Sequence, residues 1–166
     1  QYYRKNYTTS SEVSENKYYS ISLTNLALIY SEQGKYRDAG EFLKLALSYD
    51  SENNDFENMY FSQKELAKLY SKIDPASAKG YFRLALDTAQ KLNDNFKIAL
   101  IYFEAGEFYY DIGDDKKALK NFLDSKQALG INSQDENIER INSRIQDIKM
   151  RLDEESFNSI TKDYEN

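Results

Sequence analysis

Apolar residues fall at regular helical intervals along most of the chain, and this pattern predicts pairs of amphipathic helices. In the first stretch, Leu23, Leu26, Ala27 and Tyr30 stand at i, i+3, i+4 and i+7, which places them on one face of a helix. A second apolar face with similar spacing follows at residues 39–47. A glycine lies between the two stretches, and glycine is the residue type that most readily ends a helix in the left-handed conformation.

The same two patterns return twice further along, which predicts a repeat protein. The motif Leu-Ala-x-x-Tyr at residues 26–30 recurs 40 residues later, and a weaker form, Ala-Gly-x-x-Tyr, recurs after 39 more. The small and bulky residues of the second helix recur with offsets of 39 and 40. The chain therefore divides into three helix pairs, at about 13–52, 53–92 and 93–130, and no strand is expected.

This pattern resembles the tetratricopeptide repeat, in which a first helix carries Leu, a small residue and Tyr, and a second carries Ala and an aromatic residue. In the first unit the matching residues are Leu23, Leu26, Ala27, Tyr30, Ala39 and Leu43; in the third they are Tyr102, Ala105, Gly106, Tyr109, Ala118 and Phe122. The middle unit also matches, but the spacing between the leucine of its first helix and the alanine of its second helix is one residue shorter. The period near 40 exceeds the usual 34, and the family's closing proline is absent from all three units. The resemblance covers residues 14–130 and implies an all-α, right-handed superhelical solenoid of antiparallel helix pairs.

Residues 1–12 align with the end of a preceding repeat. Tyr3 falls in the position of Leu43, and Tyr7 in that of Leu47. The alternative interpretation is a tyrosine-rich tail without such structure. Because the chain begins with Gln1, we expect it to be a piece of a longer protein.

A further helix is predicted at residues 131–155. Ser133 and Glu136 form a capping box, and isoleucines at alternating spacings of three and four follow on one face. We expect this helix to cover the end of the solenoid, as such arrays require. A coiled-coil dimer seam is the alternative that the same spacing allows. Residues 156–166 are polar, and we expect them to be loosely ordered.

Composition narrows the possible chemistry. The chain contains no Cys, His or Trp, which excludes thiolate nucleophiles, Ser-His-Asp catalysis and imidazole metal sites. The oxygen-rich segment that starts at Asp50 has Asp55 and Phe61 where a calcium loop needs Gly and Glu. We therefore expect no enzyme activity, no metal and no cofactor.

Charge and hydropathy narrow the partners. The net charge of −6 does not favour nucleic acid, for which a basic patch is typical. The sequence contains neither a membrane-spanning apolar run nor an evident signal peptide, and we expect a cytoplasmic, bacterial protein.

The resemblance implies that partner segments lie along the concave face formed by the first helices. The residues expected to line this face stand two positions before and two positions after the core residues Leu26, Leu66 and Ala105, and one helical turn further on. They are Thr24, Leu28, Lys64, Lys68, Lys72, Phe103, Glu107, Tyr110 and Asp111. Arg140 and Arg144 of the last predicted helix are expected at the border of the same face. We expect the three lysines to form a basic stripe for acidic partner residues and the two aromatic residues to supply an apolar anchor. Thr24 and Leu28 replace the Lys and Asn that bind a peptide carboxylate in some relatives, so that specificity is not expected. The alternative is that all these positions are solvated helix faces.

Three functions remain open at this point. The first is a module that binds a segment of another protein in the groove. The second is a peptide-sensing regulatory domain that controls an attached effector. The third is a scaffold that assembles with copies of itself, through its N-terminal end or the isoleucine stripe.

Overall fold

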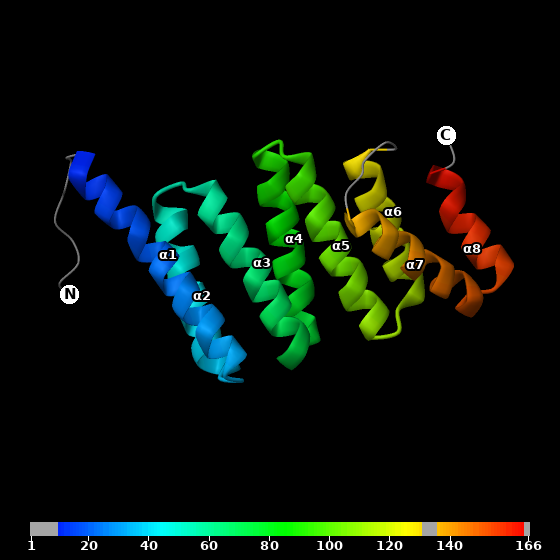
Figure 1. Ribbon diagram of the computed structural model, residues 1–166, viewed down its shortest axis with the longest axis horizontal. Coiled ribbons are helices and arrows are strands. Elements are labelled where there is room, and N and C mark those ends of the chain that lie inside the picture. Colours follow the sequence, from blue (N-terminus) through cyan, green and yellow to red (C-terminus); the bar gives the residue numbers. More distant parts are fainter. Residues whose placement is uncertain (1–9, 131–135, 165–166) are drawn as a thin grey trace.

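The computed structural model describes residues 10–130 and 136–164, and within these ranges the chain is almost entirely helical, without strands. The helices are α1 (Ser10–Glu32), α2 (Tyr36–Glu52), α3 (Phe56–Ile73), α4 (Pro75–Lys91), α5 (Asn95–Asp111), α6 (Asp115–Leu129), α7 (Glu136–Arg151) and α8 (Glu154–Thr161), followed by a 3-10 turn, Lys162–Tyr164. The helices follow one another as an elongated array, with α1 at one end and α8 at the other (Figure 1). From α1 to α7 each helix packs against the next, whereas α8 packs against α6; α1 also contacts α3, as α3 contacts α5. The helices α1, α3 and α5 therefore form one layer of the array.

Short turns separate the helices from α1 to α6, and their residues explain where these helices stop. Gly34 and Gly113 have φ angles of 74° and 77°, and they close the turns inside the first and third pairs. Asn54 and Asn93 adopt φ angles of 55° and 53° in the turns between pairs. Asn tolerates this left-handed conformation better than most residues with a side chain.

Aspartates begin most of the following helices. The side chain of Asp74 accepts hydrogen bonds from the backbone N–H groups of Ala76 and Ser77, and Pro75 occupies the first helical position. Other aspartates serve as N-caps in the same way: Asp55, Asp94, Asp114 and Asp153.

Small residues let the helices of each pair approach closely. Ala27, Ala67 and Gly106 occupy equivalent places in α1, α3 and α5, where they face the second helix of each pair. A Cβ atom on Gly106 would lie 2.7 Å from the ring of Phe122, so the third pair needs glycine here. The bulky aromatic residue across the pair takes the space that a methyl group would need.

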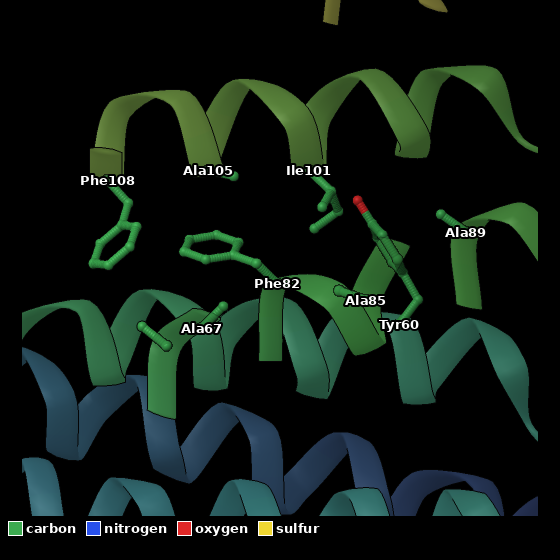
Figure 2. Packing of buried hydrophobic residues seen from close by; sticks show 9 residues of the cluster. Tyr60, Ala67, Phe82, Ala85, Ala89, Ile101, Ala105 and Phe108 are labelled. Atoms are coloured by element: carbon green, nitrogen blue, oxygen red, sulfur yellow. The ribbon is translucent and has the colours of Figure 1, made fainter. Parts of the chain in front are cut away.

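The hydrophobic core is continuous from pair to pair. In its middle part, Phe82 of α4 lies between α3 and α5, with its ring 5.6 Å from that of Phe108, and Ala67, Ala85 and Ala105 line the space around it (Figure 2). Similar clusters join α1 with α2 and α3, and α5 with α6, α7 and α8. No pair buries its apolar face alone, which is the packing rule of repeat proteins.

The C-terminal end differs from the sequence-based expectation in its last residues, and the packing of α7 argues against the alternative of a dimer seam. Residues 154–161 form helix α8 instead of a loosely ordered tail, because Phe157 and Ile160 pack into the cluster of α6 and α7. The hydroxyl of Tyr164 also donates to Asp124 at 2.5 Å. The isoleucine stripe of α7 packs inside the chain, with Ile141 and Ile148 fully buried, so it does not form a dimer seam. The predicted end of a preceding repeat lies in residues 1–9, outside the described ranges, and in residues 10–12, which belong to α1.

Candidate functional site

The predicted groove residues all lie on the odd-numbered helices, but the structure divides them into two sets. The positions two before each core residue, Thr24, Lys64 and Phe103, are largely covered: the Thr24 and Phe103 residues are 5% and 6% exposed, and the Lys64 side chain is 13% exposed. The positions two after it, Leu28, Lys68 and Glu107, retain more accessible surface. The expectation that both positions line an open groove is therefore wrong for the first of them, because that position points toward neighbouring helices.

An open pocket of about 210 Å³ lies between α1 and α3. Ala27 and Leu28 of α1, Leu43 of α2 and Leu69 of α3 supply its apolar surface. Charged residues from both helices also line it: Glu32 on α1, and Glu65, Lys68 and Lys72 on α3. The pocket can accept an apolar side chain, with groups of either charge beside it.

The three lysines of α3 do not form a uniform basic stripe. Lys64 lies 3.3 Å from Glu65 and over the ring of Phe61, away from bulk solvent. Lys68 is more exposed, and its ammonium lies 3.7 Å from the carboxylate of Glu65 and 3.9 Å from that of Glu104 on α5. The charges of Lys64 and Lys68 are therefore largely balanced by carboxylates of the chain itself.

Lys72 has a different environment from the other two lysines. Its ammonium lies 5.5 Å from the centre of the Tyr36 ring, and no carboxylate of the described residues forms an ion pair with it. A cation over an aromatic face keeps its charge available to a further anion. Among the predicted basic residues, Lys72 is thus the one best placed to meet an acidic group in the pocket.

Glu104 is a groove residue that the sequence analysis did not identify. Burial raises the pKa of its carboxyl, and the charges of Lys68 and Lys64 partly oppose that effect. Glu104 and Glu65 together neutralise the middle of the inner face. The sequence does carry a signal for both residues. Glu65 lies one helical turn before Lys68 on α3, and Glu104 stands one repeat after Glu65, on α5.

The third unit offers no open aromatic anchor, because α7 lies against its inner face. Both Arg140 and Arg144 pair with Glu107, the latter at 2.7 Å, and Arg140 stacks over Phe103 at 4.8 Å. Phe103 is buried against Phe122 as well. The prediction of Phe103 as a partner-binding anchor is therefore wrong.

Tyr110 is occupied in a similar way. Arg144 and Arg151 each lie 4.3 Å from the centre of its ring. Its hydroxyl accepts a hydrogen bond from Arg151 at 2.6 Å and lies 3.2 Å from a carboxylate oxygen of Asp147. Asp111 beside it is exposed at the end of α5. The accessible part of the groove is thus the part between α1 and α3.

The described residues offer neither a metal site nor a membrane span. No group of three or more Asp, Glu, Cys or His side chains in these ranges is placed to hold a metal ion. None of the helices in the described part is long and apolar enough to cross a bilayer.

Comparison with known proteins agrees with this architecture. Residues 21–53, which span the second half of α1 and all of α2, match the family model described as "Tetratricopeptide repeat". The chain is similar to the crystal structure of BtubC (BKLC) from P. vanneervenii, with a TM-score of 0.70 and 22% sequence identity over 87% of this chain. The match covers 61% of the BtubC chain. No curated protein matches the sequence. The expected fold class, an all-α array of consecutive helix pairs, is confirmed.

Proposed function

Because the chain is a tetratricopeptide repeat protein, we propose that it binds a segment of another protein in the pocket between α1 and α3. Repeats of this family generally mediate protein–protein interaction. The observation that carries the proposal is the pocket itself, which is lined by the partly exposed Leu28 and the largely buried Leu43 and Leu69, with charged residues beside them. A few buried apolar contacts usually dominate the affinity of such a site.

The chemistry of the pocket suggests the chemistry of the partner segment. Its surface would take one large apolar side chain, such as Leu, Ile or Met. Lys72, without a carboxylate partner in the described residues, would meet an acidic group beside that side chain. Lys68 would contribute less, because Glu65 and Glu104 already balance its charge. The partner we propose is therefore an acidic and apolar segment.

A library of random 12-residue peptides displayed on phage provides the probe. We expect selection on the chain to enrich peptides with a large apolar residue next to Asp or Glu. The double variant Lys68→Glu and Lys72→Glu should bind the selected peptide about tenfold more weakly, or worse, at low salt. This charge-dependent loss should shrink at high salt, because exposed charges are then screened.

The matched control is Lys79→Glu with Lys120→Glu, which makes the same change in net charge on exposed positions of α4 and α6. It should bind the selected peptide as the wild type does. Two results would overturn the proposed partner chemistry. One is that the Lys68→Glu and Lys72→Glu double variant binds the selected peptide as tightly as the wild type does, and the other is that selection enriches peptides without acidic residues.

A further inference from the structure

Two lysines and two glutamates form a charge-balanced cluster on the inner face, beside the pocket between α1 and α3. Three of its members belong to α3 and one to α5: Lys64, Glu65, Lys68 and Glu104. The carboxylate of Glu65 lies 3.3 Å from the ammonium of Lys64 and 3.7 Å from that of Lys68. The carboxylate of Glu104 lies 3.9 Å from the ammonium of Lys68. The cluster therefore has one carboxylate for each ammonium group, and Lys68 pairs with both carboxylates.

Lys68 is the member of this cluster that is best placed to change partners. Its side chain is 45% exposed, whereas the other three side chains are between 11% and 23% exposed. Lys68 lines the pocket toward α1, while Glu104 belongs to α5 on the other side of α3. Because a lysine ammonium stands on a flexible four-carbon stem, it can turn either to Glu104 or to a group in the pocket.

We propose that Glu104 determines how acidic a bound segment can be, by holding Lys68 on the α5 side of α3. This inference rests on the proposed peptide site. A partner carboxylate that draws Lys68 into the pocket leaves Glu104 with less counter-charge in a partly buried place, where a carboxylate is costly. Burial already raises the pKa of the Glu104 carboxyl, and the charges of Lys68 and Lys64 partly oppose that effect. The wild type therefore accepts one acidic residue at Lys72 and disfavours a second one at Lys68.

The other charged neighbours do not replace Glu104 in this role. Glu65 lies closer to Lys64 than to Lys68, so its carboxylate is shared between two ammonium groups. Arg140 of α7 also acts on Glu104, but it is paired with Glu107. Without the Glu104 charge, one carboxylate would face two ammonium groups. The excess positive charge would then lie at Lys68, on the surface of the pocket.

Glu104→Gln tests the proposal, because the amide keeps the shape of the side chain and removes its charge. Lys68 and Lys72 are one helical turn apart, about 6 Å, which is close to the spacing of alternate residues in an extended segment. The probes are the phage-selected peptide and two derivatives, which carry an added Glu two positions before or two positions after its acidic residue. Fluorescence anisotropy at low salt measures their dissociation constants. Glu104→Gln should bind at least one derivative about two- to fivefold more tightly than the wild type does.

Two further variants show whether the gain depends on Lys68. In a Lys68→Met background, Glu104→Gln should give no gain, because there is no ammonium group to release. Glu139→Gln removes the same charge from an exposed position of α7, toward the other end of the array (Figure 1). This matched control should bind all three peptides as the wild type does. Circular dichroism should show that each variant is folded.

The possible failures can be told apart. Equal affinity of Glu104→Gln and the wild type for every peptide would overturn the role of Glu104 and leave the proposed peptide site intact. A gain that persists in the Lys68→Met background would also overturn it, since the effect would then be a general loss of repulsion. If selection on the wild type enriches no apolar and acidic peptide, the proposed function fails, and the role of Glu104 fails with it.

Discussion

At the scale of single residues, the third helix pair depends on one missing methyl group. Gly106 stands where the first two pairs have Ala27 and Ala67, and the fully buried ring of Phe122 fills the space beside it. The second pair combines Ala67 with Phe82 at the same two positions, so an aromatic residue on the second helix does not by itself require glycine on the first. In the third pair, the ring of Phe122 lies so close to Gly106 that a Cβ atom there would overlap it.

Gly106→Ala should therefore destabilise the chain, although alanine favours helices more than glycine does. The added Cβ would lie 2.7 Å from the Phe122 ring, and such overpacking costs about 1–3 kcal/mol. Gly80→Ala is the control, because a Cβ there meets no atom within 4 Å, and it should stabilise by about 0.5–1 kcal/mol. Thermal or urea unfolding of both variants measures the difference. Gly106→Ala as stable as the wild type would mean that this contact is not tight.

A buried carboxyl in the first pair predicts a pH dependence of stability. Asp50 of α2 is 1% exposed, and its burial raises the pKa of the carboxyl, while a hydrogen bond with Ser20 partly opposes the shift. The corresponding position in the second pair is Ala89, so the acid is specific to the first. A raised pKa in the folded state means that folding favours the protonated form. The stabilising effect is complete below the ordinary value of 3.8 and is lost as the pH rises through the folded-state pKa.

Asp50→Asn should accordingly be more stable relative to the wild type at neutral pH than at pH 4. The amide keeps the shape of the side chain and removes the charge that is costly to bury. Urea unfolding of both proteins across this pH range measures the change. Asp87→Asn, at an exposed position of α4, is the control and should show much less pH dependence. A constant difference between Asp50→Asn and the wild type at all pH values would contradict the argument.

At the scale of helices, the pairs could be predicted from the sequence because their signals are short in range. The Leu-Ala-x-x-Tyr spacing and the glycines that end helices act within a few turns. Helix α8 was missed because Phe157 and Ile160 alone make too short an apolar pattern. The covered positions at Thr24, Lys64 and Phe103 were missed for another reason. Which side of a helix faces solvent depends on its rotation against neighbours, and repeat spacing alone does not determine that rotation.

Ala78 tests the helix crossings directly. It is fully buried on α4, where it belongs to the hydrophobic cluster that α3, α4 and α5 share. Ala78→Leu should lower the free energy of unfolding by about 1–3 kcal/mol, because the added carbons overpack the crossing. The neighbouring exposed change Ala76→Leu should have little effect. Similar melting temperatures for the two variants would show that Ala78 is not at a tight crossing.

At the scale of the whole molecule, the position of α7 determines where a partner can bind. The sequence placed the groove along all three units, with its anchor at Phe103 and Tyr110. In the structure, Arg140, Arg144 and Arg151 of α7 contact this part of the inner face. Contacts between α5 and α7 link positions about 40 residues apart, and a motif within one repeat gives no information about them. The accessible pocket therefore lies toward the N-terminal half of the array.

The most direct measurement is the change in backbone amide NMR shifts when the phage-selected peptide is added to the chain. We predict that the shifted amides centre on residues 27–32 of α1 and 65–72 of α3, around the pocket, with Leu43 of α2 among them. Shifts centred on α4 and α6, or on the contact between α5 and α7, would contradict the account.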